Sequence, residues 1–98
     1  MAYYRSPELI MAAYGRRMEF AEDRPRWRQV HEVIVERIRA GEYPPRSRVP
    51  STVALMGEFG IANVTAQKVL RQLRADGLIY TEVGMGSFVT DQPQSPNS

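Results

Sequence analysis

The sequence contains no cysteine, a single histidine and no long apolar run. The lack of cysteine excludes disulfides and thiolate metal sites. Because a membrane span needs about 18 consecutive apolar residues, the chain has no candidate span. Its N-terminus also lacks the basic and then apolar layout of a secretion signal. These absences predict a cytoplasmic protein that does not contact a membrane.

Groups suited to catalysis are scarce as well. His31 has no nucleophile beside it in the sequence and no cluster of carboxylates with which to hold a metal, and its place on a helix predicts a partly buried side chain. No pair of carboxylates has the spacing of an acid–base pair, and 98 residues offer little volume for a substrate pocket. We therefore expect no catalytic residue, no metal and no cofactor, and hence a protein that is not an enzyme.

The composition is that of one globular domain, with 43% apolar and 24% charged residues. The net charge of +2 is unevenly spread. The segment from Arg24 to Arg48 holds seven arginines and three glutamates, while the segments on either side each sum to −1. Local concentration of positive charge favours a polyanionic partner. A solvated helix face is the alternative explanation.

Apolar spacing predicts helices in the first half of the chain. Ser6-Pro7-Glu8 has the features of a helix start, and apolar residues on one face then favour a helix over 7–22. We treat 1–24 as an accessory segment. A second apolar stripe, Trp27, Val30, Ile34 and Ile38, predicts a helix that follows Pro25 and ends before Gly41.

The second half predicts two further helices and a hairpin. Ser51 caps a short helix over 51–59, Gly60 ends it, and a third helix follows over 63–75. Two short strands, within 78–83 and 87–90, flank Gly84-Met85-Gly86, and Arg48-Val49 forms one more short strand. The fold class is mainly α with a small β-wing, a winged helix-turn-helix domain over 25–90, and 91–98 form a frayed tail.

The third predicted helix has one apolar face and one polar face. Ala66, Val69, Leu70 and Leu73 fall together and must face the core. Val64, Gln67, Lys68 and Arg71 point away with no acid among them, which suits the major groove of DNA. A solvated helix is the alternative, but the preceding short helix and the following hairpin favour a recognition helix.

Other candidate contacts lie at the ends of these elements. Asn63 and Thr65 could cap the third helix or face phosphates and bases. Ser51 could be a plain cap or a phosphate ligand, and the glycines of the hairpin could serve a tight turn or a close approach to DNA. The predicted DNA-contacting residues are Ser51, Thr52, Asn63, Val64, Thr65, Gln67, Lys68, Arg71, Gly84, Gly86 and Ser87.

Residues 26–90 resemble the DNA-binding domain of the GntR family of bacterial transcription regulators. The resemblance implies a winged helix that binds an operator as a symmetric dimer and usually represses, which would place the protein at the nucleoid. The upstream "IRAGEYPPRSR" is similar to the family's link from first helix to first strand. The matching positions are Pro50-Ser51, Leu55, Glu58, Gly60, Thr65, Leu70, Arg71, Leu73, Gly77-Leu78, Gly84, Gly86 and Phe88-Val89.

The sequence departs from that family at several positions. The large C-terminal effector-binding and dimerisation domain of most members is absent from these 98 residues, so the sequence is either a stand-alone regulator or a fragment. The family usually has Thr at the position of Val64 and a capping Ser at that of Ala62. Positions where it usually or often has arginine hold Val53, Asn63, Gln67 and Met85.

The missing arginines suggest a particular operator. Amide side chains suit adenine, arginine suits guanine, and valine can touch a thymine methyl, so Asn63, Gln67 and Val64 favour A·T contacts. Arg71 and Lys68 would then hold phosphates. The remaining positive charge could come from arginines in and beside the first helix of the domain, namely Arg24, Arg26, Arg28, Arg46 and Arg48.

Two questions stay open at this level. The missing arginines and modest charge also fit a winged helix that has given up DNA and binds a protein, although the third helix presents a polar face. Helix 7–22 could pack on its own domain, which we favour, or pair with its copy in a homodimer.

Overall fold

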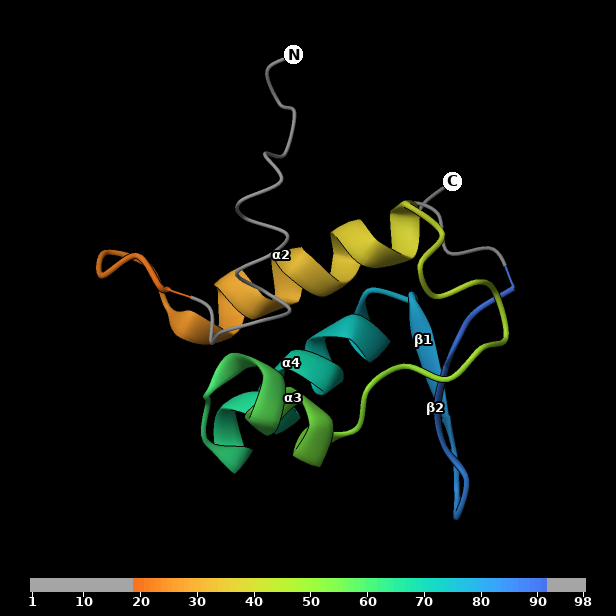
Figure 1. The fold of residues 1–98 in the computed structure, drawn as a ribbon. Coiled ribbons are helices and arrows are strands. Elements are labelled where there is room, and N and C mark those ends of the chain that lie inside the picture. Colours follow the sequence, from red (N-terminus) through yellow and green to blue (C-terminus); the bar gives the residue numbers. More distant parts are fainter. Residues whose placement is uncertain (1–18, 92–98) are drawn as a thin grey trace.

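The structure is a computed structural model that describes residues 19–91 of the chain. Within these residues three helices precede a two-stranded antiparallel hairpin, the arrangement of a winged helix-turn-helix domain (Figure 1). The predicted fold class is therefore confirmed. The elements are α2 (Arg26–Arg39), α3 (Thr52–Phe59), α4 (Asn63–Ala75), β1 (Ile79–Glu82) and β2 (Gly86–Val89).

Helix α2 forms where the apolar stripe predicted it. It starts after Pro25, and its buried apolar residues are Val30, Ile34 and Ile38. The chain then turns away at Gly41, whose φ of 85° suits a residue without a side chain. Trp27 is only partly buried and packs against the edge of the core.

The helix predicted over 7–22 is wrong for residues 19–22, the part of it that the structure describes. Residues 19–21 have no helical structure and 22–24 form a turn, while 7–18 lie outside the described residues. The buried side chain of Gln29 explains the difference. Its amide accepts from the Ala21 amide at 3.0 Å and donates to the carbonyls of Ala21 at 3.1 Å and Arg24 at 3.0 Å. These bonds satisfy backbone groups that a helix would otherwise pair.

The helix–turn–helix unit matches the predicted bounds closely. Ser51 caps α3 by accepting a hydrogen bond from the Ala54 amide at 3.2 Å. Gly60 ends α3 in the left-handed conformation, with φ 69°, and the buried side chain of Ile61 anchors the turn that leads to α4.

The wing contains more pairing than the hairpin alone. Strand β1 pairs with β2 in the register Ile79 with Val89 and Glu82 with Gly86. Arg48 forms an isolated antiparallel bridge with Phe88, so the predicted strand at 48–49 is reduced to one bridge beside β2. The predicted tail begins at Asp91, and the rest of it lies outside the described residues.

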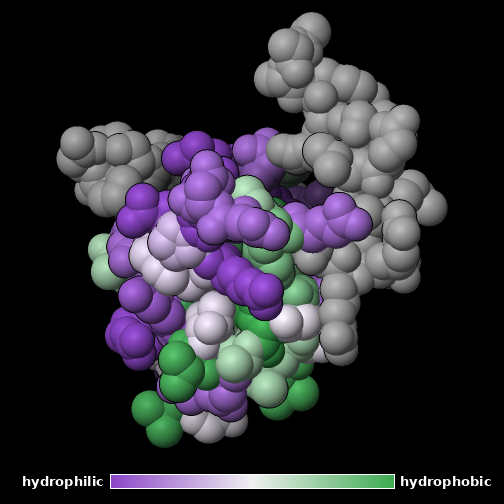
Figure 2. Space-filling model, turned by 90° about the vertical axis from the view of Figure 1, so that its left-hand side faces the viewer, coloured by the Kyte–Doolittle hydropathy of each residue, from purple (hydrophilic) through white to green (hydrophobic). Residues whose placement is uncertain are grey.

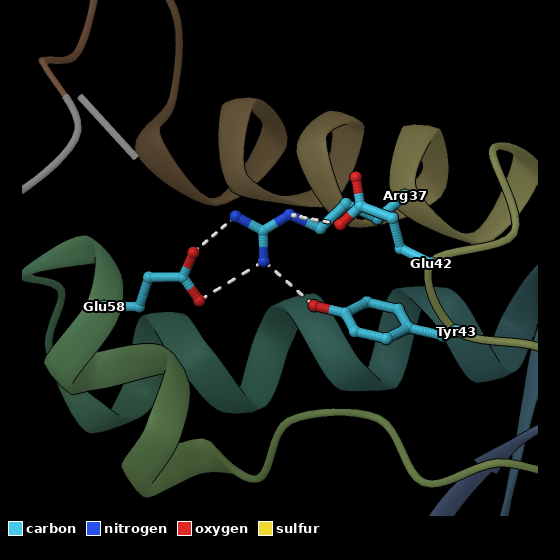
Figure 3. A network of polar contacts seen from close by, with 4 residues as sticks. All are labelled: Arg37, Glu42, Tyr43 and Glu58. Atoms are coloured by element: carbon cyan, nitrogen blue, oxygen red, sulfur yellow. Dashed lines mark hydrogen bonds and ion pairs between the residues drawn. The ribbon is translucent and has the colours of Figure 1, made fainter. Parts of the chain in front are cut away.

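Arg37 joins α2 to α3 at the edge of the core (Figure 3). Its guanidinium forms an ion pair with Glu58, and one of its nitrogens donates to the Tyr43 hydroxyl at 2.9 Å. Burial disfavours the charge on Arg37, but the hydrogen bonds to Glu58 and Tyr43 outweigh it and raise its pKa. This network fixes α3, and thus the turn into α4, against α2.

Within residues 19–91, none of the helices combines the length and apolar character needed to cross a bilayer.

Candidate nucleic-acid interface

Three parts of the fold reach the same end of the molecule. Figure 1 shows the start of α3, the start of α4 and the tip of the hairpin at the lower end, while α2 lies across the upper side. Helix N-termini carry free amide groups and partial positive charge. The lower end thus combines two helix starts with a protruding wing.

Helix α4 divides into faces as its sequence predicted. Ala66, Val69, Leu70 and Leu73 are buried in the core. The exposed side has no carboxylate along the whole helix, Asn63–Ala75, so its positive charge is not offset by an acid on the same helix. The side chains predicted to leave the core are all exposed: Val64, Gln67, Lys68 and Arg71.

The first two turns of α4 carry an interlocked pair of amides. Gln67 Nε2 donates to Asn63 Oδ1 at 2.6 Å, and both residues are exposed. The bond occupies one oxygen and one N–H, and it leaves the Gln67 oxygen and its second N–H available. Those two groups match the paired donor and acceptor that adenine presents in the major groove.

No side chain caps the start of α4. Ala62 is the N-cap residue and makes no side-chain cap hydrogen bond. The alternative that Asn63 or Thr65 caps this helix is therefore wrong. Asn63 is engaged by Gln67 instead, and Thr65, the third residue of the helix, is half-buried. The structure leaves the first amides of α4 to solvent or to a ligand.

The two cations predicted to hold phosphates differ in their surroundings. Lys68 Nζ lies 4.9 Å from the centre of the Trp27 ring, a cation–π contact that directs it toward α2. Arg71 is exposed and forms no ion pair with an acid within residues 19–91. Of the two, Arg71 has the freer side chain.

The hairpin carries the predicted wing residues. Gly84 and Gly86 are exposed at its tip with φ values of 80° and 120°, and they allow the tight turn. The Ser87 hydroxyl lies 3.0 Å from that of Thr81 across the strands. Thr81 in turn accepts from Arg74 at 3.2 Å, which ties the last turn of α4 to the wing.

The start of α3 has the plain structural role expected for its cap. Ser51 is exposed but already accepts from Ala54, and Thr52, the first helical residue, is half-buried. Neither observation assigns them a ligand, so their contact with DNA stays a prediction.

The same lower end collects the exposed large apolar side chains of residues 19–91. Val53 and Val64 are the second residues of α3 and α4, and Val83 and Met85 lie at the hairpin tip. Their exposed fractions are 74%, 74%, 97% and 57%. Figure 2 shows hydrophobic residues at this end below a more hydrophilic upper part. Three of these four positions are ones where the family resemblance led us to expect another residue.

Arginines from the basic segment are mostly engaged within the fold. Arg24 pairs with Glu32 at 2.6 Å, and Arg46 lies 3.4 Å from Asp91. Arg26 lies over Phe20, and Arg28 lies over Trp27. His31 is partly buried, as predicted, and contacts Asp76 at the end of α4 at 2.7 Å.

Sequence reasoning missed one residue of this region. Arg74 was not singled out, yet it is the link from α4 to Thr81. A signal was present, because Arg74 lies one turn beyond Arg71 and near the flank of α4 that carries Asn63 and Gln67.

Comparison with known proteins places this geometry in a family. Residues 27–89 match the family model described as bacterial regulatory proteins, gntR family. The histidine utilization repressor of Pseudomonas putida is 39% identical over 67 residues, which cover 68% of this chain and 27% of that protein. The chain thus spans about a quarter of the length of that relative.

Solved structures agree in fold. A crystal structure of AraR(DBD) in complex with operator ORR3 is 35% identical, with a TM-score of 0.66, and the match covers 74% of this chain and 84% of that one. A GntR family transcriptional regulator from Listeria monocytogenes has a TM-score of 0.71 at 25% identity, covering 74% of this chain and 64% of that one. The chain therefore belongs to the gntR family of bacterial regulatory proteins.

Proposed function

We propose that this chain binds a specific site in double-stranded DNA and represses transcription. The observation that carries the proposal is the lower end of the fold, which brings together the start of α4 with its acid-free outer face, the start of α3 and, further along, the wing tip. Two relatives support it: the one from Pseudomonas putida is a repressor by name, and AraR(DBD) is in complex with an operator.

In the proposed complex α4 enters the major groove. The outer side of α4 carries small or uncharged side chains at its N-terminal end, namely Val64 and the paired amides. Arg71 follows about two turns further along. The wing, residues 78–90, then meets the neighbouring minor groove or backbone. Such a protein would act in the cytoplasm at the nucleoid.

The operator in this proposal leans to A·T at the contacted steps. Gln67, steadied by Asn63 at 2.6 Å, would read adenine with its free oxygen and N–H. Val64, 74% exposed in the first turn of α4, would pack against a thymine methyl. Arginine, the side chain that prefers guanine, is missing from these three positions.

A homodimer on a roughly palindromic site completes the proposal. Half-sites would be about one helical turn apart, because two recognition helices related by a two-fold axis enter successive major grooves.

Fluorescence anisotropy with selected and random duplexes at two salt concentrations tests the function. We expect salt-sensitive binding that tightens at least ~10³-fold on a selected site. Selected half-sites should lean to A·T, whereas G-rich half-sites would contradict the reading by Asn63 and Gln67.

The same measurement addresses the second class of function. A winged helix that binds a protein would show little retention by DNA at any salt concentration. The exposed apolar residues at the lower end, Val53, Val64, Val83 and Met85, are the observation that favours this class. Absence of DNA binding at low salt would therefore move the assignment to it.

A further inference from the structure

The wing hairpin has no cation of its own. Between Leu78 and Thr90 the only charged residue is Glu82, and the tip is formed by Val83, Gly84 and Met85. A wing that approaches phosphates with a single carboxylate would be repelled by them. Positive charge near the wing must come from outside the hairpin.

Arg48 is held beside the hairpin by backbone bonds. It bridges Phe88, and the residues next to it complete the pairing, because the Val49 amide donates to Ser87 O and the Val89 amide donates to Ser47 O, both at 2.9 Å. Residues 47–49 thus run along β2 as a short third strand. Partners in a bridge place their side chains on the same face of a sheet.

The Arg48 side chain runs along that face toward the tip. Its guanidinium carbon lies 5.4 Å from the centre of the Phe88 ring, which itself stacks on Tyr80 at 5.8 Å. Two residues before Phe88, at the tip end of β2, a side-chain carbon built on Gly86 would lie 3.4 Å from Arg48 Nη1. The head group therefore passes from the level of Phe88 to that of Gly86, at the base of the tip.

The charge of Arg48 is not neutralised by the fold. Arg48 is exposed, and within residues 19–91 it forms no ion pair with an acid, unlike Arg24, Arg37 and Arg46. Stacking on an aromatic ring occupies the face of a guanidinium and leaves its N–H groups free at the edge. Those groups suit a phosphate oxygen.

We propose that Arg48 is a phosphate-binding cation of the wing, held along β2 by Phe88 and given room by the absence of a side chain at Gly86. The proposal rests on the DNA-binding function proposed above and adds a residue to it. Its ligand is a phosphate of the duplex backbone, so the contact carries affinity without base preference.

The test compares Arg48→Met with two other variants in the full chain. Arg48→Lys keeps the charge and loses the planar head, and Arg39→Met removes an exposed arginine from the last turn of α2, on the side away from the wing tip (Figure 1). Binding to a selected and to an unrelated duplex is measured across salt concentrations. Thermal unfolding of each variant checks that it is folded.

We expect Arg48→Met to weaken binding to both duplexes by a similar factor, about tenfold. The slope of log affinity against log salt should become shallower by about 0.9 for each bound domain. Arg48→Lys should keep the slope, and Arg39→Met should change neither quantity. An uncharged methylphosphonate at the contacted position should weaken the wild type and leave Arg48→Met unaffected.

Two results would overturn the assignment while leaving the proposed function intact. One is an unchanged salt slope in Arg48→Met with normal binding by the wild type. The other is a loss confined to the selected duplex, which would make Arg48 a reader of bases. If the wild type itself showed no salt-sensitive binding, both the proposed function and this role of Arg48 would fall.

Discussion

Helices α2 and α4 are similar in length and differ in what their charges do. Helix α2 has four arginines and two glutamates, while α4 has two arginines, one lysine and no acid. In α2, Arg37 forms an ion pair with Glu58, and Arg28 lies over the Trp27 ring. The face of α4 that leaves the core keeps an unopposed positive charge. The arginine count of a segment therefore does not by itself identify a candidate interface. The positions of the arginines and the lack of acids single out α4 as the candidate.

The largest effect should come from removing Arg37 of α2, whose charge is paired inside the fold. Arg37→Met leaves Glu58 and Tyr43 without their partner at a half-buried site, and we expect a loss of about 3 kcal/mol in the free energy of unfolding. Urea unfolding measures it. A stability equal to that of the wild type would mean that the network adds nothing to the fold.

A smaller effect should follow from removing the amide of α4 that we propose contacts a base. Gln67→Ala is expected to weaken binding to the selected site by about 2 kcal/mol, near 30-fold, and to leave binding to random DNA unchanged. Gln67 is exposed, so stability should not change. Asn63→Ala should give a weaker version of the same loss, since Asn63 steadies Gln67 at 2.6 Å. Equal losses on both duplexes would contradict base reading by Gln67.

A smaller effect again is expected from the proposed contact of Val64 with a thymine methyl. Uracil in place of the contacted thymine removes one methyl group, and we expect a loss of about 0.8 kcal/mol, near fourfold. In Val64→Ala the same change of base should have little further effect. A full, undiminished uracil penalty in that variant would show that Val64 does not make the contact.

The smallest effect should come from an arginine of the basic segment that is already paired. Arg24→Ala removes a surface pair with Glu32, and we expect less than about 0.5 kcal/mol in stability and an unchanged salt slope of DNA binding. A clearly shallower salt slope in Arg24→Ala would indicate that the basic segment contacts DNA, and it would weaken the contrast between α2 and α4.

Most of the fold was predictable because burial leaves a periodic trace in the sequence. The apolar spacing of α4 gave its bounds, 63–75, and glycines marked the ends of α3 and the hairpin tip. The helix predicted before α2 was wrong over 19–22 for a reason that does not show in the apolar periodicity of the sequence. Its backbone is satisfied by the side chain of Gln29, from the next helix, and not by its own carbonyls.

The exposed face of the candidate site was predictable from the sequence, and the contacts between its side chains were less so. Spacing identified the outer face of α4, but the partners of Lys68 and Arg74 lie on other elements, at Trp27 and Thr81. The role proposed for Arg48 depends on its pairing with Phe88, 40 positions further along the chain. Contacts between distant segments follow from the assembled fold, which local patterns do not encode.

The route of the chain through the fold has one more consequence. The described residues begin and end away from the lower end, with the segment before α2 at one side and Asp91 at the other, upper side (Figure 1). A fluorophore or a second module attached just before residue 19 or just after residue 91 would therefore join the domain away from the wing tip. An attachment at these two positions would leave the proposed DNA-contacting end of the domain uncovered, so the domain could be linked to other modules without loss of that surface.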